Sequence, residues 1–202
     1  MSHKINLIFI LSVLVIPTSV AQNWEINMTH NLNATNSSFL RHYSSTISNT
    51  SYIVCIGVPT ALATWGLIKK DKNLFRDALY IGSSVIEAFA ISGITKSIVN
   101  RDRPFEAYPD RLHPYERPES SSFPSGHTAS AFSLATSLSL RYPHWYVIAP
   151  SAVWACSVGY SRMQRGAHYP TDVLSGAIIG VGCAVANVYV NRWLNRKLFG
   201  DK

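Results

Sequence analysis

Charged residues, cysteines and uninterrupted apolar stretches are all scarce in this sequence. Asp, Glu, Lys and Arg make up only 14% of 202 residues and lie mainly between apolar segments, which favours a membrane setting over a purely aqueous one. The three cysteines, Cys55, Cys156 and Cys183, are odd in number and lie inside apolar segments. They therefore predict small core residues rather than a disulfide framework or a zinc site.

Acidic residues are fewer than basic ones, so the chain carries a formal net charge of +7. A basic excess suits an anionic partner such as phosphate groups, a membrane surface or nucleic acid. The sequence contains no recognisable nucleic-acid-binding module and its basic residues are dispersed, so we expect no nucleic-acid partner. The length of 202 residues is enough for one domain with a real core.

The first 50 residues divide into two parts. Residues 1–21 contain Lys4, an apolar run from Ile5 to Ile16 and small residues at Ser19–Ala21, which predicts a signal peptide or, if it is not cleaved, a first membrane helix. Residues 22–50 are rich in Asn, Ser and Thr and predict an exported polar lead-in. The main predicted domain then covers residues 51–195.

Five apolar segments in that domain predict an all-α helical bundle, membrane-integral, with five or six spanning helices. Each has 15–19 residues, which is short for a hydrocarbon core that needs about 20 residues of helix, so buried helices of a soluble protein are the alternative. Small residues such as those in Ser175–Gly176–Ala177 and Gly180–Val181–Gly182 suit close contact between helices in either setting. The segments are residues 52–68, 77–95, 127–141, 146–161 and 173–190.

The placement of basic residues favours the membrane interpretation. If the amino terminus starts inside and every apolar segment crosses, ten Lys and Arg residues fall inside and eight outside. Without Lys96, Arg103 and Arg162, for which a chemical role is argued below, the ratio is ten to five, which fits the positive-inside tendency. Three polar clusters then lie on the outer side whether or not residues 1–21 are cleaved, because even numbers of crossings separate them.

The first cluster is Lys96 and Arg103, which lie about two helical turns apart. They face one way if the helix continues past Lys96. Pro104 biases Arg103 away from helical geometry and predicts the end of the element there. Lys supplies a point charge, and Arg supplies a planar fork that binds two phosphate oxygens. The alternative is a basic collar that anchors a helix end.

The second cluster, Pro124–Ser125–Gly126–His127, directly precedes an apolar segment. The backbone amides of Ser125, Gly126 and His127 at a helix start can point towards an anion. His127 lies where it can give a proton to a leaving oxygen. The alternative is a serine-rich turn with a helix cap.

The third cluster combines Ser161–Arg162, at the end of one apolar segment, with His168 and Asp172 at the start of the next. An Asp four residues after a His can accept the imidazole N–H and leave the other ring nitrogen as a nucleophile. The alternative is that His168 and Asp172 only cap a helix. Since this cationic region has no carboxylate cluster, we expect no metal and no other cofactor.

Taken together, the spacing Lys96-x6-Arg103-Pro104, Pro124-Ser125-Gly126-His127 and Ser161-Arg162-x5-His168-x3-Asp172 resembles the three-part signature of the type 2 phosphatidic acid phosphatase and vanadium haloperoxidase superfamily. The resemblance covers residues from about 50 to 190 and implies a helical bundle with the site at one end.

The resemblance also implies a role for each matched residue. His168 attacks phosphorus and forms a phosphohistidine, Asp172 orients His168, and His127 protonates the leaving group and then activates water. No metal is required in the phosphatase branch of the family. The implied phosphate-binding residues are Lys96, Arg103, Ser125, Gly126 and Arg162.

The implied function is a metal-independent phosphatase that hydrolyses a phosphate monoester or pyrophosphate of a lipid at the periplasmic face of a bacterial inner membrane. Candidate substrates are undecaprenyl pyrophosphate, phosphatidylglycerophosphate, phosphatidic acid and lipid A. The alternatives are a soluble periplasmic non-specific acid phosphatase, a vanadate-dependent haloperoxidase, and a non-catalytic anion-binding or transport membrane protein. The sequence leaves the particular lipid and the oligomeric state open.

Overall fold

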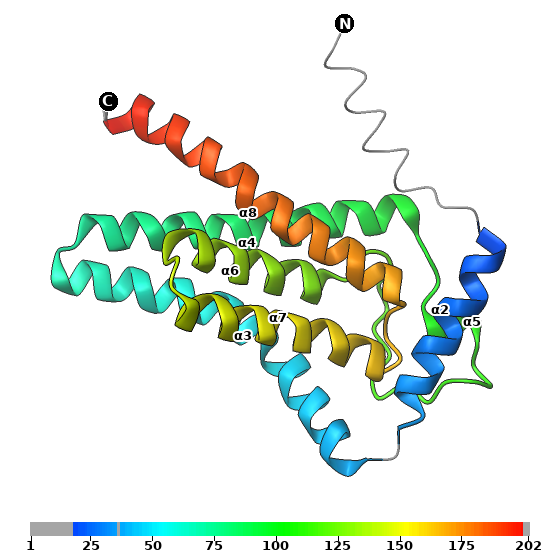
Figure 1. Cartoon of the computed structure of the whole chain (residues 1–202). Coiled ribbons are helices and arrows are strands. Elements are labelled where there is room, and N and C mark those ends of the chain that lie inside the picture. Colours follow the sequence, from blue (N-terminus) through cyan, green and yellow to red (C-terminus); the bar gives the residue numbers. More distant parts are fainter. Residues whose placement is uncertain (1–17, 36, 200–202) are drawn as a thin grey trace, which may run out of the picture.

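The computed structural model describes residues 18–35 and 37–199, with side chains described from Trp24 to Arg192. The predicted signal peptide or first membrane helix at residues 1–21 therefore lies almost wholly outside the described residues. All regular structure in the described part of the chain is helical, which confirms the predicted all-α fold. The helices are α2 (Thr18–Asn33), α3 (Ser38–Lys69), α4 (Lys72–Val99), α5 (Pro104–Ala107), α6 (Gly126–Arg141), α7 (Trp145–Gln164) and α8 (Pro170–Phe199) (Figure 1).

Each of the five predicted apolar segments lies inside one of the long helices α3, α4, α6, α7 and α8. Helix α3 begins well before its apolar segment, because Ser37 caps it by accepting a hydrogen bond from the Leu40 amide. Residues 38–50 of the polar amino-terminal region therefore form the first turns of α3, and residues 18–33 form the separate helix α2.

Helices α3 and α4 form a hairpin whose tight connection is encoded locally. Lys70 ends α3 in a left-handed conformation with φ of 54°. Asp71 then caps α4 by accepting hydrogen bonds from the amides of Asn73 (2.9 Å) and Leu74 (3.1 Å). A side chain at Gly66 would lie 2.9 Å from the Phe75 amide nitrogen, so this turn requires glycine there.

Helix α6 lies at the centre of the bundle, packed against α8, α7, α4 and α3. Its buried residues are small, mainly alanine and serine. Gly176 and Gly180 of α8 bring the two helices close together, because a Cβ at Gly176 would overlap the Ser125 carbonyl and one at Gly180 the Ala129 carbonyl. Small residues at such an interface are typical of helices that associate by close packing in a membrane.

The exterior of the bundle carries large apolar side chains, whereas its interior contains small and polar ones. Large side chains such as Ile53 of α3, Ile86 of α4 and Ile178 of α8 are more than 60% exposed. Within the described residues, three helical stretches are long and apolar enough to cross a membrane: Ser38–Lys69, Lys72–Ala107 and Pro170–Arg192. The predicted five or six spans are therefore not confirmed. The central position of α6 gives one reason, because a surrounded helix does not need an apolar outer face.

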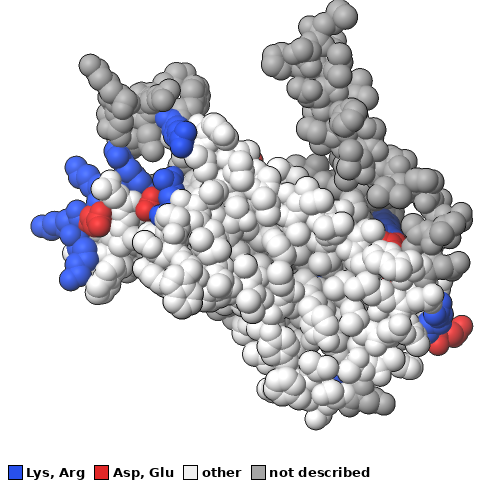
Figure 2. Space-filling model, viewed as in Figure 1, with Lys and Arg blue, Asp and Glu red and all other residues white. Residues whose placement is uncertain are grey.

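The distribution of charge matches this apolar exterior. Figure 2 shows a broad uncharged area over the middle of the molecule and charged side chains gathered at the end where α3 joins α4. Lys69, Lys70 and Lys72 at this turn are all exposed. Of the cysteines predicted to be core residues, Cys55 and Cys183 are buried, but Cys156 is exposed on α7, where the apolar exterior accommodates it.

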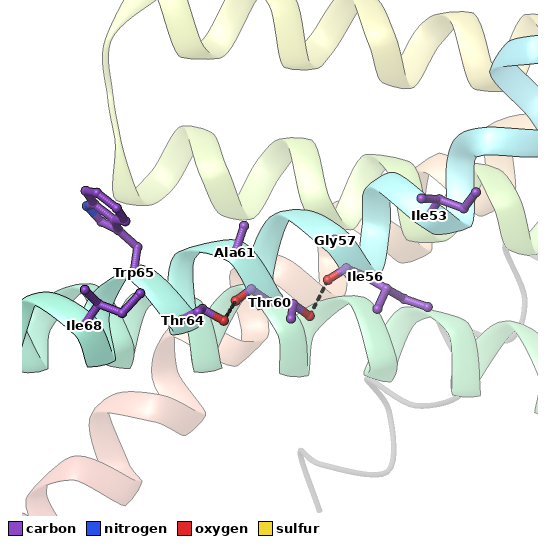
Figure 3. Close-up of a pocket in the computed structure, with 8 residues that line it drawn as sticks. All are labelled: Ile53, Ile56, Gly57, Thr60, Ala61, Thr64, Trp65 and Ile68. Carbon is purple, nitrogen blue, oxygen red and sulfur yellow. Dashed lines mark hydrogen bonds between the residues drawn. The ribbon is translucent and has the colours of Figure 1, made fainter.

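A shallow apolar groove runs along the outer face of α3 (Figure 3). Its polar members, Thr60 and Thr64, donate their hydroxyl hydrogens to the carbonyl oxygens of Ile56 (2.7 Å) and Thr60 (2.9 Å), so no free polar group faces the groove from these side chains. This surface therefore suits contact with hydrocarbon. The lining residues are Ile53, Ile56, Gly57, Thr60, Ala61, Thr64, Trp65 and Ile68.

Candidate active site

The residues of the three clusters come from helix ends at the same end of the bundle, opposite the α3–α4 turn (Figure 1). Lys96 lies in the last turn of α4, and Arg162 in the last turn of α7. His127 lies in the first turn of α6 and Asp172 in the first turn of α8, with His168 just before it. The antiparallel arrangement of these helices brings together groups that are far apart in the sequence.

Arg103 reaches the site from an extended linker rather than from α4. The helix ends at Val99 because Asn100 adopts a left-handed conformation with φ of 46°, and Arg103 caps the short helix α5 with Pro104 at its first position. The Arg103 Nη1 donates to the Ala167 carbonyl (2.8 Å) and lies 3.3 Å from the His168 Nε2. Its Nε donates to the Ser120 carbonyl (2.7 Å).

His168 and Asp172 are adjacent and fully buried. The His168 Nδ1 lies 3.5 Å from the Asp172 Oδ2, which is long for a hydrogen bond but within ion-pair range. Nε2 faces Arg103 on the opposite side of the ring. Burial lowers the pKa of His168 to about 3, and the charges of Arg162 and Arg103 act in the same direction against Asp172. The imidazole is therefore neutral at pH 7, with a lone pair available.

Three further groups hold the Asp172 carboxylate. Ser122 donates its hydroxyl hydrogen to Oδ2, and the Tyr169 amide donates to the same oxygen (2.9 Å). Arg101 donates from Nη1 to Oδ1 (2.7 Å). Each of the two carboxylate oxygens thus has a donor, which fixes the plane of the group beside His168.

Arg162 is only 2% exposed and its charge is paired with a carboxylate. Nη1 donates to the Ser48 hydroxyl (2.6 Å), and Nη2 forms an ion pair with Glu116. Glu116 also pairs with Arg165 (2.9 Å). Burial alone would raise the pKa of Glu116, but Arg162 and Arg165 outweigh it and lower that pKa, so the carboxylate is ionised.

Lys96 contacts the serine-rich loop rather than His168. Its Nζ donates to the carbonyl oxygens of Ser121 and Ser122 (3.3 Å for the latter), and the Ser121 hydroxyl donates back to the Lys96 carbonyl (2.9 Å). Ser122 is also a donor to Asp172. Lys96 is therefore joined to the site through this loop.

The second cluster forms the amino-terminal cap of α6. Ser125 caps the helix, and its own amide donates to the Asp172 carbonyl (2.9 Å), which ties α6 to α8. The prediction that the Ser125 amide faces an anion is therefore wrong, because this carbonyl already occupies it. The amides of Gly126 and His127 belong to the first turn, whose N–H groups have no partner inside a helix. A Cβ at Gly126 would meet only the Tyr52 hydroxyl at 3.6 Å, so glycine leaves this space open.

His127 lies against Tyr52, with ring centroids 4.1 Å apart. Burial lowers the pKa of His127, and the nearby Arg162, His168, Arg103 and Lys96 act in the same direction. The structure thus gathers His127, His168 and the predicted cationic residues in one electrostatic neighbourhood. Within the described residues, no three His, Cys, Asp or Glu side chains are grouped so that they could hold a metal ion.

Several residues of this region were not predicted. Glu116 and Ser122 lie in the proline-rich connection between α5 and α6, and Ser48 lies in the early turns of α3. Arg101 lies between two matched motif positions, and Glu25 lies in α2. A buried role for Glu25 has no local signal beyond its being an acidic residue in a polar segment otherwise rich in Asn, Ser and Thr.

Fold and site together define a helical membrane protein with a buried cationic site, carrying a His–Asp pair, at one end of the bundle. The PAP2 superfamily model matches residues 77–196. The chain belongs to the PAP2 superfamily.

Individual relatives agree with this assignment. The chain is 28% identical to an undecaprenyl-diphosphatase, BcrC, of Bacillus subtilis over 70% of this chain and 74% of that protein. It is 42% identical to a lipid A 1-phosphatase of Porphyromonas gingivalis over 35% of this chain, and the match spans only 16% of that relative's length. The fold resembles the crystal structure of a transmembrane PAP2-type phosphatidylglycerolphosphate phosphatase from Bacillus subtilis, with a TM-score of 0.68, 21% identity and 98% of both chains covered.

Proposed function

We propose that this protein is a metal-independent phosphatase that removes phosphate from a membrane lipid through a phosphohistidine at His168. The observation that carries the proposal is the buried pair His168–Asp172 with the Arg103 guanidinium 3.3 Å from the His168 Nε2. A neutral imidazole whose free nitrogen points at a phosphate-binding fork is an arrangement suited to attack on phosphorus.

Substrate binding begins with the cationic groups. Arg103 and Arg162 bind the non-bridging phosphoryl oxygens, with Arg162 exchanging its contact to Glu116 for the phosphate. The amides of Gly126 and His127 at the start of α6 add donors along the positive end of the helix. Lys96 and Ser125 complete the phosphate-binding set and hold the surrounding loop.

The chemical step is attack of the His168 Nε2 on phosphorus. Asp172 accepts the Nδ1 proton in a hydrogen bond and stabilises the positive charge that develops on the ring. A bond forms between Nε2 and phosphorus while the bond between phosphorus and the lipid oxygen breaks. Burial and the nearby cations lower the pKa of His127, so His127 takes up a proton only as the anionic phosphate enters and offsets those cations. It gives this proton to the leaving oxygen, then takes a proton from the water that hydrolyses the phosphohistidine.

The names of the relatives support a lipid-linked substrate. Undecaprenyl pyrophosphate, lipid A, phosphatidylglycerophosphate and phosphatidic acid all present a terminal phosphate on a lipid, which a site at the end of a membrane bundle can reach from the surface. We place the protein in a bacterial inner membrane with the site facing the periplasm. Residues 1–21 are then a signal peptide or a first membrane helix, and 51–195 is the catalytic domain.

The soluble acid phosphatase is the second candidate, and the exposed apolar side chains of α3, α4 and α8 weigh against it. The intact pair of histidines weighs against a non-catalytic anion carrier, which has no need of a nucleophile.

The decisive test is His168→Ala in purified, detergent-solubilised protein. We expect phosphate release from a panel of the four lipid classes to fall at least about 10³-fold, because the nucleophile is lost. Binding of inorganic phosphate should survive, because the arginines remain. Labelled phosphate should be trapped on the wild-type protein after quenching and not on the variant. Near-normal turnover by His168→Ala would contradict the mechanism.

A further inference from the structure

Arg101 links the Asp172 carboxylate to a second, buried carboxylate from the amino-terminal helix. Its Nη1 donates to the Asp172 Oδ1 (2.7 Å) and the Thr171 hydroxyl (2.9 Å), and its Nη2 donates to the Glu25 Oε2 (2.6 Å). The guanidinium also stacks over the Tyr169 ring, 4.0 Å from its centroid. Glu25 itself accepts a hydrogen bond from Thr171.

Contacts other than Glu25 also hold helix α2. Ile26 is 1% exposed and packs with Phe105, Leu112 and Tyr169. Asn33, at the other end of α2, donates to the carbonyl oxygens of His113 and Gln164 (3.0 Å each) and accepts from the His113 amide (2.8 Å). Glu25, only 3% exposed, is thus a buried carboxylate on a helix that other contacts also hold in place.

We propose that Arg101 and Glu25 are positioning residues for catalysis: Arg101 fixes the Asp172 carboxylate beside His168, and Glu25 of α2 orients Arg101 and balances its charge. This rests on the proposed role of His168. It assigns to the polar amino-terminal region, which lies outside the family match at residues 77–196, a direct influence on the reacting centre.

The physical basis is a row of alternating charges. During attack His168 becomes positive, and Asp172, Arg101 and Glu25 follow as negative, positive and negative groups. The positive charge of Arg101 offsets part of the negative charge that Asp172 presents to His168. Glu25 in turn offsets part of the positive charge of Arg101. Other charged or titratable groups also face His168 and Asp172: Arg103 of the linker, Arg162 of α7, Lys96 of α4, His127 of α6 and Tyr169 just before α8.

Two substitutions of Arg101 distinguish the effect of its positive charge from the effect of its hydrogen bonds. Arg101→Met should lower kcat about 10–100-fold, because Asp172 loses its fixed plane, while KM changes less than about 3-fold since Arg101 does not bind phosphate. The acid limb of the pH–rate profile should move up by about one unit, because loss of a nearby cation makes protonation of His168 easier. Arg101→Lys should restore the limb to its wild-type position and part of kcat.

Glu25→Gln removes a negative charge near Arg101, so its electrostatic effect on His168 should be opposite to that of Arg101→Met. The amide keeps an acceptor for Arg101, so kcat should fall by less than in Arg101→Met, and the acid limb should stay or move to lower pH. Arg111→Ala is the matched control, because the Arg111 Nη2 joins the Asn27 side chain of the same helix (2.8 Å) on the exposed surface. It should leave kcat and the profile unchanged.

The proposal is overturned if Arg101→Met leaves the acid limb in place, if Arg101→Lys is as impaired as Arg101→Met, or if Glu25→Gln is no more affected than Arg111→Ala. Failure of the proposed function has a separate signature, since His168→Ala would then retain turnover and wild-type protein would carry no phosphohistidine.

Discussion

At the scale of single residues, the two arginines of the site are held in different ways. Arg103 donates to the carbonyl oxygens of Ala167 and Ser120, so its orientation is fixed by neutral acceptors. Arg162 is paired with the ionised Glu116. Under the proposed function, a phosphate that enters the site uses the positive charge of Arg103 at once, but must replace Glu116 at Arg162. Such preorganised donors are well suited to stabilising charge that develops in the transition state.

The fork of Arg162 should matter more than its charge. In Arg162→Lys we expect kcat/KM to fall about 10²-fold, because one ammonium group cannot reproduce separate contacts from Nη1 to Ser48 and from Nη2 to the anion. Steady-state phosphate release would measure this.

The matched control for this prediction is Arg165→Lys, which alters a neighbouring arginine that pairs with the same Glu116. It should change kcat/KM less than about 3-fold. Equal losses in both variants would mean that charge near Glu116, rather than the Arg162 fork, is what the reaction needs.

At the scale of elements, the contact between α6 and α8 sets the geometry of the site. The Ser125 amide at the start of α6 donates to the Asp172 carbonyl in the first turn of α8, so the two helix ends that carry His127 and Asp172 are joined directly. Farther along, Gly176 and Gly180 allow the backbones to approach. A change in this spacing alters the separation of the two histidines without touching either.

Gly180→Ala tests this contact. The added methyl overlaps the Ala129 carbonyl and the Ser133 amide of α6, so we expect a loss of about 1–3 kcal/mol in the free energy of unfolding. The midpoint of thermal unfolding in detergent would report it.

Gly182→Ala, two residues along the same helix, is the control, because a Cβ there meets nothing within 4 Å. It should be neutral or slightly stabilising, since alanine favours helix. If the two variants were equally stable, the close approach of α6 and α8 would not be limiting.

At the scale of the whole molecule, polarity is arranged with small and polar residues inside and large apolar ones outside. Exposed isoleucines occur on α3, α4 and α8, while α6 buries alanine and serine. In water a protein with such an exposed apolar surface aggregates, whereas the hydrocarbon of a membrane solvates that surface. Under the proposed function, the end of the bundle that carries His168 and the lysine-bearing α3–α4 turn lie towards opposite faces of the bilayer.

This arrangement predicts how the protein behaves in cell fractionation. It should stay in the membrane pellet after washing with alkaline carbonate and require detergent for release, because apolar area rather than ionic contact holds it. A periplasmic marker enzyme in the same preparation should be released and serves as the control. Recovery of the protein in the wash would favour the soluble acid phosphatase.

The sequence by itself determined the all-helical class, the approximate position of each long helix and the motif residues, because hydropathy and helix caps act over a few neighbouring residues. Two predictions go beyond what these local signals settled. A shared helix face for Lys96 and Arg103 requires α4 to continue to Arg103, but the left-handed Asn100 ends the helix at Val99. The apolar segments predict five or six spans, but within the described part of the chain three helical stretches are long and apolar enough to cross a membrane.

Only the tertiary structure decided which charges meet. The pairs Glu25–Arg101 and Glu116–Arg162 join segments with no shared period or spacing, and Glu25 lies 76 residues from its partner. A buried ion pair forms only where folding brings both charged groups together and shields them from water. Here the packing of α2 and of the proline-rich connection does this. The sequence therefore contained the proposed reacting groups, and folding selected the carboxylates that contact the arginines around them.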